Sequence, residues 1–283
     1  SIYGARAMAG VIVVTTKKGR AGQAHINYTG EFTTRMIPSY SQFNILNSQE
    51  QMGIYQEMAD KGWLNVSDVL NGSDYGVYGD MWHRINTYDA KTGQFQLANT
   101  DEARNAFLQT AEWRNTNWFK ELFSNSVMQN HSLSMSGGTK KSNYYVSMSF
   151  MDDPGWYKES QMKRYTANFN ASHHILDNLT FTLLGSASYR KQKAPGTLSQ
   201  DVDAVNGQVK RDFDINPYSY ALNTSRTLDP DTYYQANYAP FNIVNELENN
   251  NINMNVVNTK FQGEIAYNPI SDLRLHIVGA VQY

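Results

Sequence analysis

The chain has 283 residues, 24 Lys and Arg against 26 Asp and Glu, a formal net charge of -2 and no cysteine. This balance gives no sign of a nucleic-acid surface or an acidic tail, and the lack of cysteine excludes disulfides and thiolate metal sites. The mean hydropathy of -0.56 is ordinary for a soluble protein. A membrane β-barrel gives similar values, because only alternate residues of its strands face lipid.

The chain opens with a turn of small residues followed by an apolar strand, in the sequence SIYGARAMAGVIVVTTKKG. Gly4 and Gly10 enclose alternating alanines that permit close backbone approach, and Arg6 places a guanidinium beside the turn. The run 11–16 is β-branched without polar alternation, which is typical of a strand covered on both faces. On these residues alone, an ordinary buried strand with a basic turn remains the alternative.

Seven later segments alternate apolar and polar residues, which predicts strands with one apolar and one polar face. The predicted strands lie within residues 26–33, 132–136, 144–150, 165–172, 181–189, 257–267 and 273–283. Their connections alternate between tight turns and longer loops of roughly 90, ten and 60 residues. Short turns at one rim and long loops at the other favour a transmembrane barrel over a soluble sandwich or a lipocalin-like barrel.

Tyrosines on the apolar face predict two aromatic girdles. The expected positions are Tyr28, Tyr144 and Tyr267 near the short turns, and Tyr165, Tyr189 and Tyr283 near the long loops. Seven strands cannot close without unpaired edges, which are costly in hydrocarbon, so we expect further strands beyond residue 283. The chain also begins without methionine and stops within a predicted strand, so we expect it to be a fragment.

The long loops are predicted to carry helices. Ser48 and Gln51 fit a capping box, which starts a helix that should end near Gly62. A second helix is expected after Thr100, since Asp101 and the glutamate that follows it suit a first helical turn.

Aromatic residues in these loops are the candidates for ligand binding, because they can stack on sugar rings or hold a peptide. The candidate residues are Trp63, Tyr75, Tyr78, Trp82, Trp156, Tyr233 and Tyr234. The alternative is that they pack the loops against the barrel or a partner. Trp113 and Trp118 lie on a predicted amphipathic helix and are expected to be packing residues.

Catalytic and metal-binding patterns are weak in this sequence. His173 and His174 are adjacent in a strand and should point to opposite faces, so both cannot bind one metal ion. Asp201 and Asp203 lack the spacing of a calcium loop, and a surface turn explains them better. With no nucleophile motif and no phosphate loop, we expect no enzyme activity, no cofactor and no metal.

Three segments resemble SusC/RagA-type TonB-dependent outer-membrane transporters. They are residues 1–19, 115–150 and 162–189, which together cover most of the chain outside the two longest loops. In the first, Tyr3, Gly4, Arg6 and Gly10 match the end of the family's plug domain. The second resembles the family's Trp-containing helix end, two serine-rich strands and a Gly-Gly turn, and the third its next hairpin.

The resemblance implies an all-β fold, a partial antiparallel transmembrane β-barrel with about seven strands of a 22-strand barrel. Residues 1–22 would be the end of the plug and residues 23–283 the first part of the barrel. It further implies an integral protein of the bacterial outer membrane that imports a bulky nutrient, either an oligosaccharide or an oligopeptide. A SusD-like surface lipoprotein would close over the cargo, and TonB would act through a plug segment absent from this sequence. A barrel-borne adhesin or carbohydrate-binding protein without energised transport is the alternative.

Overall fold

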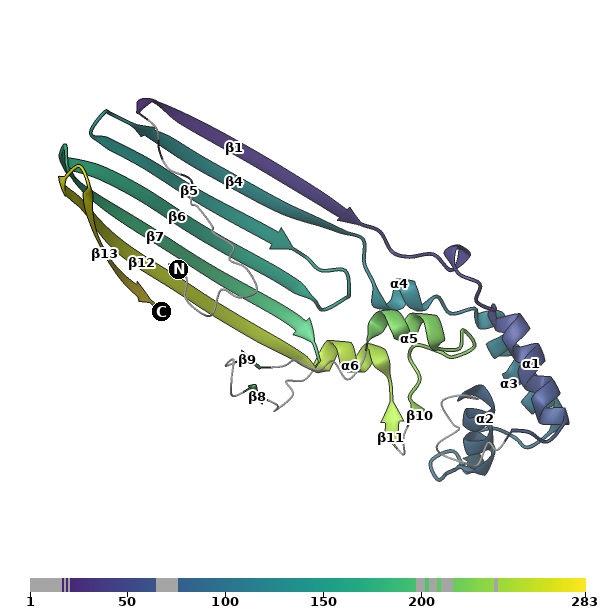
Figure 1. The fold of residues 1–283 in the computed structure, drawn as a ribbon. Coiled ribbons are helices and arrows are strands. Elements are labelled where there is room, and N and C mark those ends of the chain that lie inside the picture. Colours follow the sequence, from purple (N-terminus) through teal and green to yellow (C-terminus); the bar gives the residue numbers. More distant parts are fainter. Residues whose placement is uncertain are drawn as a thin grey trace.

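One antiparallel sheet of seven strands forms most of the structure, with the order β1-β4-β5-β6-β7-β12-β13 (Figure 1). The computed structural model describes residues 17, 19, 21–64, 76–196, 202–203, 208–209, 216–236 and 239–283. The strands are β1 (Gly22–Arg35), β4 (Ser126–Gly138), β5 (Ser142–Asp153), β6 (Gln161–Leu176), β7 (Leu179–Pro195), β12 (Asn251–Ile270) and β13 (Leu273–Gln282). All seven predicted strands are confirmed, and most are longer than their alternation indicated.

Within the described residues, three two-stranded sheets accompany the large sheet. They pair β2 (Tyr88–Asp89) with β3 (Gln94–Phe95), β8 (Val202–Asp203) with β9 (Gln208–Val209), and β10 (Tyr234–Ala236) with β11 (Ala239–Phe241). The connections of the large sheet alternate as predicted: the turns 139–141, 177–178 and 271–272 are short, and 36–125, 154–160 and 196–250 are longer. The short turns and the helices lie at opposite ends of the sheet (Figure 1). Among the described residues β1 and β13 are the edge strands, so the sheet is an open section of a barrel wall.

The apolar face of this sheet is exposed along its whole width. Phe261, Ile265 and Leu275 are 55%, 43% and 48% exposed, and no described segment packs over them. A sandwich or a soluble barrel would bury such a row inside a core. In a transmembrane barrel the same row faces hydrocarbon. The exposed apolar face therefore confirms the predicted fold class, part of a transmembrane barrel.

The aromatic residues of this face require one correction. Tyr165 and Tyr189 are stacked with their ring centroids 6.3 Å apart, toward the long-loop ends of β6 and β7. Tyr28 was expected near the short turns, but it pairs with Leu133 in the middle of β4. Its hydroxyl group lies 2.6 Å from His131 Nδ1, which places it beside the row nearer the long loops. The prediction is wrong because β1 begins at Gly22, several residues before the alternation becomes visible.

The two longest loops fold into a helical cap at one end of the sheet. Its helices are α1 (Ser48–Asp60), α2 (Gly76–Asn86), α3 (Asp101–Arg114), α4 (Trp118–Leu122), α5 (Pro217–Asn223) and α6 (Ile243–Asn249), and a 3-10 turn spans Tyr40–Gln42. The buried side chains of the cap are Met52, Val77, Tyr78, Ala111, Trp118, Phe119, Leu122, Phe123, Ala221, Leu228, Ile243 and Leu247. This core joins both loops, because its residues come from each of them. Within the described ranges, no helix is long and apolar enough to cross a membrane.

The start of α1 differs by one residue from the prediction. The capping box is formed by Asn47 and Glu50, with Glu50 N donating to Asn47 Oδ1 over 2.9 Å. Ser48 lies inside the helix, where its hydroxyl group donates to Glu112 O over 2.6 Å and accepts from Asn115 N over 3.0 Å. The predicted cap was wrong because Ser48 serves to tie α1 to the end of α3.

The other helix predictions have mixed outcomes. Thr100 caps α3 as expected, since its side chain accepts a hydrogen bond from Ala103 N over 3.3 Å. Trp118 is 2% exposed and packs in the cap, as predicted. Trp113 is 71% exposed, so its prediction as a packing residue is wrong. It lies on the outer side of α3, whereas Ala111 on the same helix is buried.

Candidate functional site

The inner face of the sheet carries a polar hollow of about 600 Å³. Its polar lining residues are Lys17, Tyr145, Ser147, Asn168, Asn170, Thr182, Ser186, Lys260, Gln262 and Glu264. Gln262 Nε2 donates to Glu264 Oε1 over 2.6 Å, and His276 Nε2 lies 3.6 Å from Glu264 Oε2. Alternation along each strand places these groups opposite the apolar face. One wall therefore presents hydrocarbon-like side chains outside and hydrogen-bonding side chains inside.

The start of the described chain lies against this inner face. Asn170 Nδ2 donates a hydrogen bond to Lys17 O over 3.1 Å. Gly19 is buried, and a Cβ atom built on it would lie 2.2 Å from Tyr144 O. Backbone can approach β5 this closely only because glycine has no side chain. The predicted plug-end residues Tyr3, Gly4, Arg6 and Gly10 lie outside the described residues.

A clamp inside the cap ties the two long loops together. Gln51 Oε1 on α1 accepts hydrogen bonds from Ser225 Oγ over 2.8 Å and from Arg226 N over 2.9 Å. Trp118 Nε1 on α4 donates to Ser225 O over 3.0 Å. Because these partners are more than 100 residues apart in sequence, nothing local to either loop signals the clamp.

Tyr40 and Arg226 form the second half of this clamp. The Arg226 guanidinium lies over the Tyr40 ring, 4.2 Å from its centroid, and donates to Thr116 O over 3.1 Å. Tyr40 donates its hydroxyl hydrogen to Ala221 O over 2.7 Å. Burial raises the pKa of Tyr40 to about 12, although the positive charge of Arg226 opposes this shift. Burial also lowers the pKa of Arg226 below its ordinary value. The clamp thus holds a neutral phenol against a cation.

Two of the predicted ligand-binding aromatics are exposed on the cap. Trp63 is 63% exposed, with Lys61 Nζ 4.7 Å from its ring centroid, and Tyr233 is 54% exposed. Trp82 on α2 is half-buried, and its ring meets His83 edge-on with the centroids 5.1 Å apart. Such rings are accessible to a ligand approaching from the long-loop side.

The remaining candidate aromatics pack inside the cap or lie outside the described residues. Tyr78 is 7% exposed, and burial raises its pKa above the ordinary value. The hydroxyl oxygen of Tyr234 accepts a hydrogen bond from Asp229 N over 2.9 Å. Trp156 packs against Phe123 with the centroids 4.9 Å apart. Tyr78, Tyr234 and Trp156 therefore pack within the cap, and Tyr75 lies outside the described residues.

The adjacent histidines of β6 point to opposite faces, as predicted. His173 Nδ1 lies 2.6 Å from Ser142 Oγ, whereas His174 Nδ1 lies 2.8 Å from Thr180 Oγ1. Ser142 belongs to β5 and Thr180 to β7, so each ring has a different strand as its partner. Within the part of the chain that the structure describes, no group of three or more His, Cys, Asp or Glu residues could hold a metal ion.

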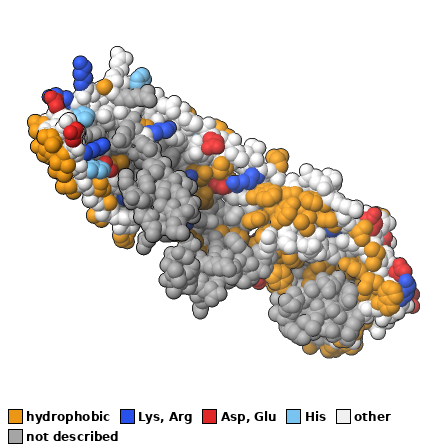
Figure 2. Space-filling model, in the orientation of Figure 1, with side chains coloured by type: hydrophobic (Ala, Val, Ile, Leu, Met, Phe, Trp, Pro, Cys, Tyr) orange, Lys and Arg blue, Asp and Glu red, His pale blue; other side chains and the backbone are white. Residues whose placement is uncertain are grey.

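These features define a class of protein. An open antiparallel wall with an exposed apolar face, a polar inner face and a cap of long loops is a section of an outer-membrane β-barrel. Figure 2 shows charged side chains of both signs over the sheet and hydrophobic side chains gathered over the helices. An N-terminal segment lying against the inner wall is the further feature that a plug would supply.

Sequence relatives specify this class further. The chain is 28% identical over 294 residues to the TonB-dependent receptor SusC of Bacteroides thetaiotaomicron, covering 98% of this chain and 24% of that protein. It is 22% identical over 273 residues to the TonB-dependent receptor P3 of Formosa agariphila, covering 88% of this chain and 22% of that protein. The chain thus spans about a quarter of the length of these relatives. No family model matches it.

Solved structures show the same fold. The RagAB peptide importer in its closed-closed state matches with a TM-score of 0.65 and 20% identity, over 100% of this chain and 30% of that chain. The open-open state of the same importer gives a TM-score of 0.63 at 20% identity, with the same coverage of both chains. The predicted resemblance to SusC/RagA-type TonB-dependent transporters is therefore confirmed in sequence and in fold. The chain is part of an integral protein of the bacterial outer membrane.

Proposed function

We propose that this chain is the first part of the barrel of a TonB-dependent importer for a bulky nutrient. The observation that carries the proposal is the contact of the segment at Lys17 and Gly19 with the polar inner face. A barrel that only binds ligand outside needs no segment across its lumen, whereas an importer needs a movable plug there. The likeness to two TonB-dependent receptors supports the same reading.

The cap is the proposed site of first contact with the nutrient. Trp63 and Tyr233 are exposed there, and Trp82 is half-buried. Aromatic faces bind sugar rings and apolar peptide side chains alike, so an oligosaccharide and an oligopeptide both remain candidates. RagAB is a peptide importer, which adds weight to a peptide cargo without excluding a glycan.

A SusD-like surface lipoprotein is the proposed partner of the cap. Ile54 on α1 and Trp113 on α3 are 46% and 71% exposed, and these two helices lie beyond the end of the sheet opposite the short turns (Figure 1). Exposed Trp and Ile side chains on neighbouring helices suit a protein contact. TonB would act on plug residues upstream of this chain. The boundary between plug and barrel at residues 22 and 23 remains part of the proposal.

Uptake by the full-length transporter tests this function. Cells that carry the full gene would be given labelled oligosaccharides and oligopeptides, with and without active TonB. We expect one cargo class to accumulate inside only when TonB is active. The double variant Trp63→Ala, Tyr233→Ala should lower uptake, whereas Tyr88→Ala, at another exposed tyrosine of the cap, should not.

An adhesin or binding protein without transport is the second candidate function. The well-packed cap, with rings exposed on its surface, would suit that role as well. In that case labelled cargo would bind to the cell surface equally with or without TonB and would never reach the periplasm. Equal surface binding and no accumulation would therefore contradict import.

A further inference from the structure

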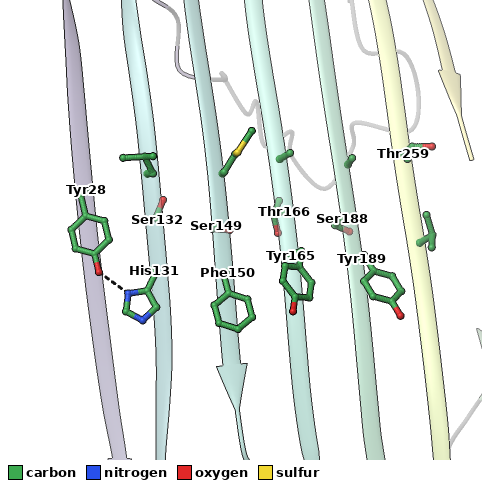
Figure 3. A pocket seen from close by; sticks show the side chains of 15 residues that line it. Tyr28, His131, Ser132, Ser149, Phe150, Tyr165, Thr166, Ser188, Tyr189 and Thr259 are labelled. Carbon is green, nitrogen blue, oxygen red and sulfur yellow. Dashed lines mark hydrogen bonds between the residues drawn. The ribbon is translucent and has the colours of Figure 1, made fainter.

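The outer apolar face carries a hollow of about 540 Å³ on β4 to β12 (Figure 3). Its floor is formed where small side chains lie opposite one another, since Ala167 pairs with Ala187 and Ala187 pairs with Thr259. Met148 on β5 pairs with Ala167, on the side of Ala167 away from Ala187. Because this face points away from the lumen, further barrel strands or a plug would not cover it.

A row of rings borders the hollow on the side of the long loops. Phe150 and Tyr165 lie with their centroids 5.0 Å apart, and Tyr165 stacks on Tyr189 at 6.3 Å. Figure 3 shows Tyr28, His131, Phe150, Tyr165 and Tyr189 at nearly one level, and they belong to β1, β4, β5, β6 and β7. Aromatic rows of this kind mark the boundary between hydrocarbon and headgroups. The hollow therefore lies at the depth of acyl chains, directly below the headgroups of the outer leaflet.

Two lysines lie directly opposite one another just beyond this row. Lys163 pairs with Lys191 across β6 and β7, each two residues from a tyrosine of the row and on the same face. Asp152 Oδ2 lies 3.5 Å from Lys163 Nζ. Among the described residues, no carboxylate forms an ion pair with Lys191. Like charges directly opposite each other across two strands are destabilising. Asp152 offsets the charge of Lys163, so the charge of Lys191 is the one left for an external anion.

We propose that this outer wall binds one phosphorylated glycolipid of the outer leaflet, with the chemistry of lipid A. The phosphate accepts hydrogen bonds from Lys163 and Lys191, and an acyl chain fills the hollow over Ala167 and Ala187. Strand geometry places the lysines roughly 7 Å from the tyrosines, so one lipid spans both features. A zwitterionic phospholipid would bring its own cation and would not offset the charge of Lys191. This inference is independent of the cargo of the transporter.

Lipid binding to the delipidated full-length protein tests the site. Native mass spectrometry would count bound diphosphorylated lipid A, phosphatidylglycerol and phosphatidylethanolamine, each added alone. We expect one lipid A to bind well above the other two. Lys191→Glu should weaken its affinity about tenfold, because it replaces an attraction with a repulsion. Lys141→Glu, the same charge change in a short turn at the other rim, should leave the affinity unchanged.

A second variant tests the hollow separately from the charge. Ala167→Phe fills the hollow from an exposed position and should also weaken lipid A binding, whereas Val281→Phe adds a ring elsewhere on the same face and should not. Equal binding of lipid A by the natural protein and Lys191→Glu would overturn the proposal. So would equal binding of all three lipids, which would indicate a general lipid coat. Equal binding of lipid A and phosphatidylglycerol would overturn the assignment to a glycolipid.

Discussion

Gly185 on β7 shows how closely the outer face is packed at the level of single residues. A Cβ atom at this position would lie 2.0 Å from Phe169 Cε1, because the Phe169 ring covers the glycine. Gly185→Val should therefore displace the ring and destabilise the folded barrel by about 1–3 kcal/mol. The loss would be measured as a lower temperature at which the full-length barrel loses its folded mobility on a gel.

Gly263 provides the matched control for this prediction. It lies on the same face of the next strand, where the atom nearest to an added Cβ is Phe181 Cε2 at 4.0 Å. Gly263→Val should be tolerated, since the space is open. If both valine variants melted at the natural temperature, the close approach of the Phe169 ring would be refuted.

Neighbouring residues of β13 should respond oppositely to arginine. Ile277 is 67% exposed on the apolar face, so Ile277→Arg places a charge in hydrocarbon at a cost of about 2–4 kcal/mol near the midplane. Leu275→Arg should behave in the same way. His276 faces inward, 3.6 Å from Glu264 Oε2, so His276→Arg places a cation beside that carboxylate and should be tolerated. Quantifying folded protein in outer-membrane fractions checks this, and equal yields of all three variants would contradict the facing assignment.

Single side chains were the hardest feature to predict from the sequence. Trp113 and Trp118 share a helical region, yet one is exposed and the other buried, because the packing surface is provided by the second loop. Ser48 has the residue type of a helix cap but bonds to α3 instead. Both outcomes depend on contacts between distant parts of the chain, which local patterns do not contain.

At the scale of elements, strands were predictable and loop packing was not. A strand with one face in lipid and the other facing polar groups must alternate, so each of the seven strands could be recognised alone. The alternation of short and long connections then predicted that all short turns lie at one end of the sheet and all long loops at the other. The clamp between Gln51 and Arg226 joins two loops that are separated by four strands of the sheet, and no period in the sequence signals it. Among the predicted ligand-binding residues, Trp63 and Tyr233 are exposed and Tyr78 is buried. This difference also depends on how the two loops pack, which the sequence pattern does not show.

The cap should lose stability in strongly alkaline solution. Burial raises the pKa of both Tyr40 and Tyr220 to about 12, against about 10 for an unfolded tyrosine. As the pH rises, these tyrosines therefore lose their protons at a lower pH in the unfolded cap than in the folded cap. Their contribution to the stability of the folded cap is complete below about pH 10 and falls between pH 10 and 12. Phenolate absorbance and protease resistance of the cap would be followed across this range.

Tyr40→Phe separates this effect from general alkaline unfolding. The variant loses the hydrogen bond to Ala221 O, so its cap should be weaker at neutral pH, but its stability should fall less steeply above pH 10. An unchanged slope in the variant would show that Tyr40 does not contribute to the pH dependence.

At the scale of the whole molecule, the inner wall is expected to hold the N-terminal segment. Gly19→Ala adds a methyl group 2.2 Å from Tyr144 O. Because this oxygen belongs to the backbone, no change of side-chain rotamer can relieve the clash. The variant should expose the chain at Lys17 and Gly19 to protease in the full-length protein while the strands remain folded. Ala21→Ser, at an exposed neighbouring position, should not. Equal protection of both variants would contradict the docking.

One face of this sheet touches lipid and the other does not. This chain has no cysteine. In the full-length protein, with every cysteine outside this chain replaced by serine, single cysteines would be placed at each position from 273 to 281 and spin-labelled in a bilayer. Collisions with oxygen and with a water-soluble nickel complex then report lipid and water separately. We predict high oxygen and low nickel accessibility at 273, 275, 277, 279 and 281, with the reverse at the even positions. Nickel accessibility at the odd positions, or no alternation, would contradict the membrane assignment.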